Sequence, residues 1–248
     1  MSKNKPIRIG ILGGMGPLAG VELHRLIIEA TPATIDQDHL QVVLFTDPKI
    51  PDRTTSLAED AGQRFAASAC QSVRVLEQAG AELICIACMT AHSKIETIQQ
   101  ATSVPIINGI KLIHQALRHQ YAGQKIALLA TNGSINAGIY TAASDGIDWL
   151  LPEPALQELV NDAIYKIKAG KIESGRLLIA AIAHLLQEQG ATAFVLGCTE
   201  LGLLFTDLRK RNFEVVDPMR LIAAHVAWLT FEDHRQHQAN QHTAATKA

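Results

Sequence analysis

"QAGAELICIACMT" (residues 78–90) and "EQGATAFVLGCTE" (residues 188–200) align residue by residue, and this internal repeat decides the fold. In each stretch a helix is expected to end at Gly-Ala, an apolar strand follows, and a cysteine comes eight residues after the glycine. These cysteines are Cys88 and Cys198. The chain therefore reads as two similar halves, each with a cysteine at the carboxyl end of an equivalent strand.

Other parts of the chain repeat in the same way. Three further pairs keep nearly the same offset: "IRIGILGG" (7–14) with "QKIALLAT" (124–131), "VVLFTDP" (42–48) with "WLLPEP" (149–154), and "VPIING" (104–109) with "FEVVDP" (213–218). Short β-rich runs alternate with longer amphipathic runs, which is typical of α/β folds with parallel sheets. The repeat predicts two pseudo-symmetric, Rossmann-like α/β domains, each with a mainly parallel sheet flanked by helices.

The same alternation gives the expected elements. Strands are expected at Arg8–Leu12, Gln41–Thr46, Leu83–Ala87, Pro105–Asn108, Lys125–Ala130, Asp148–Leu151, Ala193–Leu196 and Phe213–Asp217. Helices are expected near Pro17–Thr31, Leu57–Ala79, Ser93–Thr102, Ile110–His119, Asn136–Asp145, Glu153–Ala169, Ser174–Gln189 and Pro218–His234. Residues 1–103 plus 217–248 should form an N-terminal domain completed by the C-terminal helix. Residues 104–216 should form the second domain.

Composition limits the class of protein. The chain has 248 residues, 48% of them hydrophobic, and a formal net charge of −2, so a large core is expected and a nucleic-acid footprint is not. The first residues lack the features of a signal peptide, and no apolar run reaches the roughly 18 residues of a membrane helix. We expect a cytoplasmic protein without a membrane partner. Its cysteines should then stay reduced: Cys70, Cys85, Cys88 and Cys198.

The position of the repeated cysteines points to a site. In open parallel sheets, ligands bind beyond the carboxyl ends of the strands. Two related halves that face each other across a cleft would place Cys88 and Cys198 on opposite walls. The helix N-termini that follow offer free N–H groups and positive dipole ends, which lower a thiol pKa and can hold a carboxylate.

Several roles compete for Cys88. A strand-end cysteine is most often a buried structural residue, as we expect for Cys70 and Cys85. Cys85 and Cys88 with His92 suggest zinc or redox chemistry, but alternation along a strand points the two thiols to opposite faces, and no second CxxC follows. A nucleophilic pair of Cys88 with His92 does not explain the repeated cysteine. Two facing thiols suit inversion of a stereocentre, because one removes a proton while the other returns one to the opposite face.

Five motifs resemble the cofactor-independent Asp/Glu racemase superfamily, and most closely its aspartate racemase branch. They are "GILGGMGPLAG" (10–20), "IPDRTT" (50–55), "CMTAHS" (88–93), "AIYKIKAGKI" (163–172) and "LGCTEL" (196–201). The resemblance implies two pseudo-symmetric α/β domains, an interdomain active site, two catalytic cysteines, no pyridoxal phosphate or other cofactor, no metal, and a homodimer. The "GGMGP" turn lacks the spacing of a dinucleotide loop.

Matched position by position, the resemblance implies roles for individual residues. Cys88 and Cys198 become the acid/base pair, Arg53 reads the side-chain carboxylate, and Lys168 belongs to a second carboxylate-binding site. The family usually has Asn where this chain has Met89, which exchanges a hydrogen-bonding amide for an apolar thioether. The other expected substrate contacts are Met15, Thr90, Thr131, Thr199 and Glu200.

The sequence therefore predicts an amino-acid racemase that interconverts L- and D-aspartate without pyridoxal phosphate. Three alternatives stay open: a glutamate or broader amino-acid racemase, a maleate isomerase-like or hydantoin racemase-like enzyme, and a non-catalytic amino-acid-binding protein. Two cationic carboxylate readers, Arg53 and Lys168, favour a dicarboxylic amino acid over a hydantoin. A binding protein without activity would have Met89 as its mark.

Overall fold

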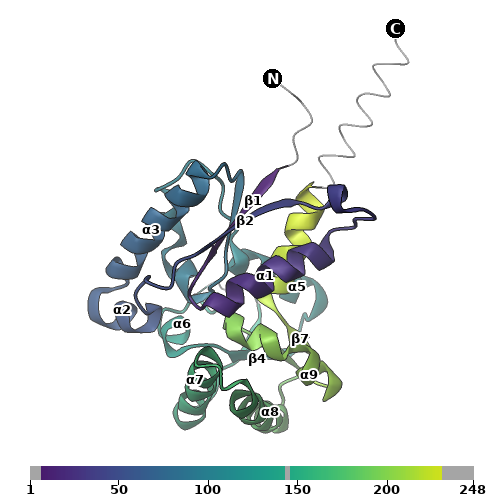
Figure 1. Cartoon of the computed structure of the whole chain (residues 1–248). Helices are drawn as coiled ribbons and strands as arrows, with labels where there is room; N and C mark the ends of the chain where they lie inside the picture. Colours follow the sequence, from purple (N-terminus) through teal and green to yellow (C-terminus); the bar gives the residue numbers. More distant parts are fainter. Residues whose placement is uncertain (1–6, 143–145, 231–248) are drawn as a thin grey trace.

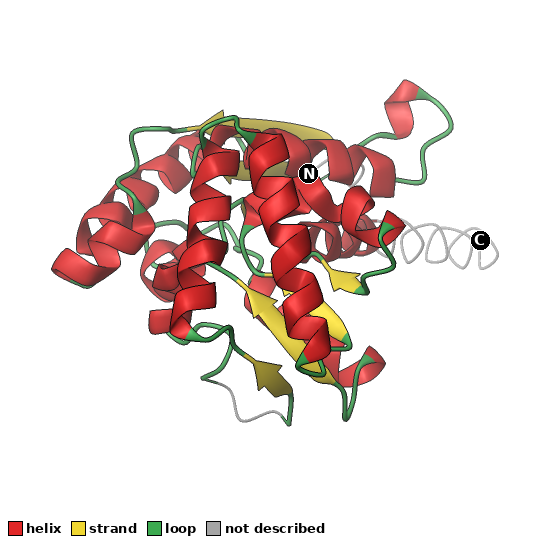
Figure 2. Cartoon of the chain, turned by 90° about the horizontal axis from the view of Figure 1, so that it is seen from below, coloured by secondary structure: helices red, strands yellow, loops and turns green. Residues whose placement is uncertain are grey.

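The computed structural model describes residues 7–142 and 146–230 and contains two sheets whose strands run parallel. The first sheet has the order β2-β1-β3 and the second the order β5-β4-β6-β7. Figure 1 labels β1 and β2 of the first sheet and β4 and β7 of the second. Helices flank the sheets, as Figure 2 shows with helices in red and strands in yellow. The predicted α/β class with two mainly parallel sheets is confirmed.

The first half is built around β1 (Arg8–Gly13), which lies between β2 (Gln41–Thr46) and β3 (Leu83–Ile86). The strand is buried along nearly its whole length, as expected for a parallel strand that is covered on both faces. α1 (Pro17–Ala30) leads from β1 to β2, and α3 (Gln63–Gln78) leads back to β3. The carboxyl ends of the strands consequently meet at one edge of the sheet.

The second half repeats this arrangement. Its main elements are β4 (Lys125–Leu129), β5 (Asp148–Leu150), α7 (Pro154–Lys168), α8 (Ile172–Glu188), β6 (Ala193–Leu196) and β7 (Val215–Val216). α7 and α8 pack against each other and against one face of the sheet, with Ile164, Ile179 and Leu129 in a common apolar cluster. β6 is the counterpart of β3, as the aligned stretches predict.

One apolar cluster joins the two halves. It contains Ile9 of β1, Ile126 of β4, Val195 of β6 and Ile222 of the C-terminal helix, which spans 218–230 in the described part of the chain. Burial of each such side chain stabilises the fold by about 1.5–3 kcal/mol. The proposed domain division stays a prediction; Ile106, just beyond the expected boundary, pairs with Ile84 in the first sheet.

The prediction of one long helix at 57–79 is wrong, because the structure has two helices there. The structure has α2 (Arg53–Asp60) and then α3, separated by Ala61 and Gly62 in left-handed conformations with φ of 54° and 81°. Gly62 adopts this conformation without a steric penalty, because it has no Cβ. The chain turns at this residue, and α3 starts in a new direction. The apolar periodicity runs through both helices and therefore hides the break.

The helix expected at 136–145 is misplaced. α6 (Asn132–Asn136) instead begins directly after Thr131, whose hydroxyl accepts a hydrogen bond from the Ser134 N–H and caps the helix. Turns follow, and the last expected residues, 143–145, lie outside the described residues. Thr-x-x-Ser is a capping spacing that the apolar pattern does not reveal.

The strand expected at 105–108 is reduced to a single bridge. The Ile106 N–H donates to Gln99 Oε1 at 2.8 Å, so a side chain replaces the next strand. The expected helices at 93–102 and 110–119 are found with shifted bounds. Residues 231–234 of the helix expected at 218–234 lie outside the described part.

The remaining elements are η1 (Asp36–Asp38), η2 (Thr90–Lys94), α4 (Ile95–Gln99), α5 (Gly109–Gln120), η3 (Thr199–Leu204) and α9 (Phe205–Lys210).

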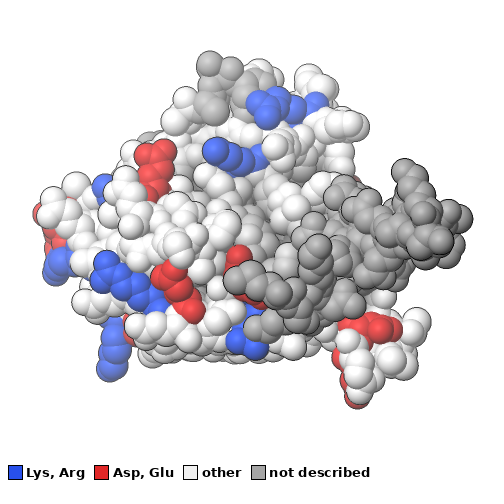
Figure 3. Space-filling view, turned by 90° about the horizontal axis from the view of Figure 1, so that it is seen from above, with Lys and Arg blue, Asp and Glu red and all other residues white. Residues whose placement is uncertain are grey.

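The surface carries mixed charge. On the face in Figure 3, basic and acidic side chains are interspersed, and neither sign covers the face. Among the described residues, no helix combines the length and the apolar character that a membrane crossing requires.

Candidate active site

The two repeated cysteines occupy equivalent places. Cys88 lies two residues after the end of β3, and Cys198 lies two residues after the end of β6. Both side chains are 4% exposed. Each is followed within two residues by a 3-10 helix, η2 after Cys88 and η3 after Cys198. The repeat has therefore placed one buried thiol at the carboxyl edge of each sheet.

Lys168, at the end of α7, shares its surroundings with both thiols. Burial lowers the pKa of its ammonium group, but the negative charges of Glu200, Cys198 and Cys88 act against burial and leave the pKa raised above its ordinary value. The charge of Arg53 lowers the same pKa, so both cations and both thiols act within one site. Cys88 and Cys198 consequently lie within electrostatic reach of the same cation.

Glu200 connects Cys198 to the first half. The Cys198 thiol donates to Glu200 Oε2 at 2.9 Å, and the Gly16 N–H, before α1, donates to Glu200 Oε1 at 2.9 Å. Burial, followed by the negative charge of Glu200, raises the pKa of the Cys198 thiol well above its ordinary value. Glu200 as a residue is only 3% exposed, and both of its carboxylate oxygens accept hydrogen bonds inside the protein.

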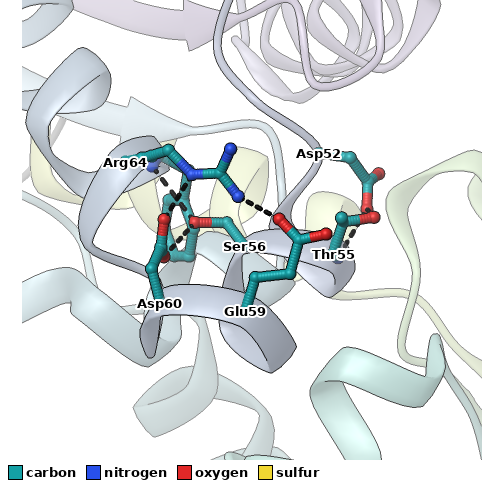
Figure 4. Close-up of polar contacts among 7 residues, drawn as sticks. Asp52, Thr55, Ser56, Glu59, Asp60 and Arg64 are labelled. Atoms are coloured by element: carbon teal, nitrogen blue, oxygen red, sulfur yellow. Dashed lines mark hydrogen bonds and ion pairs between the residues drawn. The ribbon is translucent and has the colours of Figure 1, made fainter.

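Arg53 is a buried cation near Cys88. It is the first residue of α2, which is capped by Asp52 through a 2.9 Å hydrogen bond from the Thr55 N–H (Figure 4). The guanidinium donates to the Met15 carbonyl at 2.8 Å and to the Pro51 carbonyl at 3.1 Å. Burial lowers its pKa, yet the charge of Cys88 and then that of Asp52 leave it raised. Arg53 is thus held as a permanent charge.

A polar contact joins the two halves beside these cations. The Tyr165 hydroxyl, on α7, lies 3.2 Å from each oxygen of Asp52, at the start of α2. Lys168 Nζ lies 5.1 Å from the centre of the Tyr165 ring. Burial raises the pKa of Asp52, but the Thr55 N–H and the charges of Arg53 and Lys168 lower it overall. Asp52 therefore stays an anion that links α2 to α7.

Three buried hydroxyl groups form a second contact between the halves. Thr90 Oγ1 lies 3.0 Å from Thr131 Oγ1 and 2.9 Å from Ser134 Oγ, and the last two lie 3.1 Å apart. Thr199 Oγ1 also crosses between the halves and donates to the Ala87 carbonyl at 3.3 Å. The sequence prediction did not include Ser134, and its spacing from Thr131 in a capping motif was the available signal.

Met15 and Met89 have different surroundings. Met15 is buried in the apolar cluster that includes Cys88 and Ile50, and its carbonyl holds Arg53. The Met89 side chain packs in the core, and its methyl carbon lies 3.1 Å from the place where a Cβ on Gly109 would be. This core position does not support the predicted contact between the Met89 side chain and a substrate.

His92 holds the backbone around Cys88. Its Nε2 accepts from the Gly109 N–H at 3.1 Å, so the proton lies on Nδ1, which donates to the Cys88 carbonyl at 3.0 Å. Burial lowers the pKa of the imidazole, which keeps it neutral. With both nitrogens bound to backbone, His92 is unavailable as a base for Cys88.

Across the described residues, no group of three or more His, Cys, Asp or Glu side chains is arranged to hold a metal ion.

Tyr140 is a further residue of the site that the sequence did not reveal. Its hydroxyl donates to the Gly197 carbonyl at 2.9 Å, directly before Cys198. Burial, then the charges of Cys198 and Cys88, raise the pKa of Tyr140 well above its ordinary value. A single tyrosine in a stretch expected to be helical gives no sequence signal, because only the fold brings it beside both thiols.

Fold and site together define an α/β enzyme with its polar centre between two parallel-sheet halves. The chain belongs to the Asp/Glu/hydantoin racemase family, whose family model matches residues 12–226. Its class is therefore that of the racemases, which are isomerases.

Solved and characterised relatives agree with this placement. The chain is similar to aspartate racemase from Picrophilus torridus, with a TM-score of 0.81 and 28% identity over 90% of this chain and 94% of that one. It is 25% identical to the broad specificity amino-acid racemase RacX of Bacillus subtilis (strain 168), over 87% of this chain and 94% of that protein. Glutamate racemase from Francisella tularensis shares the fold, with a TM-score of 0.70 and 19% identity over 94% and 83% of the two chains.

Proposed function

We propose that this protein interconverts L- and D-aspartate without pyridoxal phosphate, with Cys88 and Cys198 as a thiol/thiolate pair. One observation carries the proposal: two buried thiols end equivalent strands of the two sheets and act on the same ammonium group, that of Lys168. A single nucleophile would not need the second thiol.

The proposed reaction moves two protons. The thiolate of one cysteine takes the α-proton of the amino acid and becomes a thiol, while the other thiol gives its proton to the opposite face and becomes a thiolate. The α-carbon acquires carbanion character in between. Fixed charges and donors stabilise that state, because they need no reorganisation as the charge develops. Arg53, Lys168 and the N–H groups that open η2 and η3 are the groups available for this.

Two cations favour a dicarboxylic substrate. Arg53 Nε is buried and finds no hydrogen-bond partner within the described part of the chain, so this group has a donor left for a carboxylate. The charge of Arg53 also acts on Lys168, which supports a single site with two cations. The similarity to an aspartate racemase at 28% identity supports aspartate, and the similarity to RacX keeps glutamate and other amino acids as second candidates.

The experiment uses the purified protein in deuterium oxide with L-aspartate or L-glutamate and no added cofactor. We expect D-aspartate by chiral chromatography and deuterium at Cα by mass spectrometry, with aspartate turned over faster than glutamate. Cys88→Ala and Cys198→Ala should each lose racemisation, and either can keep exchange from one enantiomer. Normal racemisation by Cys198→Ala would contradict the two-thiol scheme.

The proposal includes a cytoplasmic homodimer, which the family resemblance supports. Light scattering of the full chain after size-exclusion chromatography tests this part, and a mass near twice the 26.8 kDa of one chain is the expected result. A monomeric mass at working concentration would remove the dimer from the proposal and leave the chemistry untouched.

A further inference from the structure

The two thiols have neighbours of opposite charge. Cys198 Sγ lies 2.9 Å from a carboxylate oxygen of Glu200. Cys88 instead acts on the guanidinium of Arg53, whose pKa burial lowers and the charge of Cys88 raises. The repeat is therefore symmetric in its cysteines and asymmetric in what surrounds them.

Glu200 accepts at both oxygens. Gly16 N–H occupies Oε1, while Oε2 faces Cys198 Sγ and, at 3.3 Å, the Thr199 hydroxyl. The Cys198 thiol is the donor in its contact with Oε2, and burial together with the charge of Glu200 raises the pKa of that thiol, so the proton lies on sulfur. Lys168, whose raised pKa owes most to Glu200, supplies the compensating positive charge.

We propose that Glu200 is a positioning residue that keeps the proton on Cys198, which makes Cys198 the proton donor of the resting enzyme and leaves the role of proton acceptor to Cys88. This inference rests on the proposed function and deepens it, since it assigns the resting base and acid. The charged or titratable groups that act on Cys198 include Glu200, Lys168, Cys88 and Tyr140. Lys168 opposes the effect of Glu200, but burial and Glu200 exceed it.

The assignment has a consequence for turnover. When Cys88 takes the α-proton and Cys198 gives its proton to the other face, Cys198 becomes a thiolate 2.9 Å from the Glu200 carboxylate. Two negative groups at that separation repel each other strongly in a buried site. A proton must then return to Cys198 and leave Cys88 before the starting form is restored. No other reactant is consumed, so protons balance over the cycle.

Selective alkylation tests the inference without relying on turnover. The full-length protein is treated briefly with iodoacetamide at pH 7 and at rising pH, and each cysteine peptide is quantified by mass spectrometry. Only thiolates react, so Cys88 should be labelled about tenfold faster than Cys198 at pH 7. Because both side chains are 4% exposed, unequal exposure does not account for such a difference. Cys198 labelling should rise as alkaline pH removes its proton.

Glu200→Gln keeps the shape of the side chain and removes its charge. We expect Cys198 labelling to increase about fivefold or more at pH 7, whereas Glu200→Asp keeps the low rate. Glu188→Gln, an exposed position at the end of α8, is the matched control and should leave both rates unchanged. Thermal unfolding of each variant verifies the fold, and the wild-type pH series stands even if a variant fails to fold.

The outcomes separate this inference from the proposed function. Selective Cys88 labelling in a protein that does not racemise aspartate would support the thiol assignment and refute the proposed function. Equal labelling of both thiols in an active racemase would overturn the assignment alone, as would an unchanged ratio in folded Glu200→Gln.

Discussion

Arg53 is held in place by backbone carbonyls, and a lysine has too few donors to reproduce these contacts. Three carbonyl oxygens, those of Met15, Ile50 and Pro51, lie within 2.8–3.4 Å of its terminal nitrogens. A lysine has one terminal nitrogen and no planar fork, so it cannot bind these carbonyls and a substrate carboxylate together.

We predict that Arg53→Lys lowers kcat/KM for aspartate by about 10- to 100-fold and destabilises the fold by about 1–3 kcal/mol, since buried hydrogen bonds to a charged group are lost. Steady-state kinetics and urea unfolding measure the two effects. Arg64→Lys is the matched control: Arg64 is exposed on α3 and pairs only on the surface with Glu59 and Asp60 (Figure 4). A full-activity Arg53→Lys enzyme would remove Arg53 from carboxylate recognition.

At the scale of elements, several helices near the site begin with a side-chain cap that follows a strand or loop. Asp52 caps α2, Thr131 caps α6, and Asn108 caps α5. Asp217 does the same for the C-terminal helix, where Oδ1 accepts from the Met219 N–H at 2.9 Å. The caps fix where each helix begins, and thereby where Arg53, Thr131 and their neighbours enter the site.

Asp217 is a cap that also carries an energetic cost. Burial raises the pKa of its carboxyl to about 6, from 3.8. Between these values the folded state binds a proton that the unfolded state has lost, so this contribution to stability is present at low pH and is lost as pH rises through about 6. An asparagine at this position can still accept from Met219 and has no charge to bury.

We therefore predict that Asp217→Asn raises the free energy of unfolding at pH 8, by up to about 3 kcal/mol, and changes it little at pH 4. Urea unfolding at both pH values measures the difference from wild type, which cancels effects of other titrating groups such as His92. Asp148→Asn, at an exposed position at the start of β5, is the control. Equal effects of Asp217→Asn at both pH values would contradict the buried-charge explanation.

At the scale of the whole molecule, contacts between the two halves enclose the site. These contacts include the hydroxyl cluster of Thr90, Thr131 and Ser134 and the contact between Tyr165 and Asp52. With the cysteines 4% exposed, we expect a substrate to reach them only when contacts between the halves open. Contacts between the halves should consequently affect binding more than chemistry.

Tyr165→Phe removes one of these contacts and leaves the ring in place. We predict a rise in KM for aspartate of about three- to tenfold with kcat changed by less than about twofold, because the net contribution of one partly exposed hydrogen bond is about 0.5–1.5 kcal/mol. Tyr121→Phe, which loses a 2.7 Å hydrogen bond to Glu214 within the second half, is the matched control. A fall in kcat with unchanged KM would assign Tyr165 to the chemistry instead.

The sequence by itself determined the parallel α/β halves, the equivalence of Cys88 and Cys198, and the strand ends at which they lie. These follow from local patterns, since apolar runs, Gly-Ala helix ends and a fixed cysteine spacing act within about a dozen residues. Caps and breaks were harder to predict, as the misplaced helix at 136–145 and the break at Gly62 illustrate.

Only the tertiary structure decided which groups meet between the halves. It brings Glu200 to Gly16, Tyr140 to both thiols and Ser134 to Thr90, and it turns Met89 into the core. These residues are distant along the chain, and their types alone are compatible with ordinary surface or core positions. Their proximity depends on the packing of two sheets against shared helices, which no local pattern encodes.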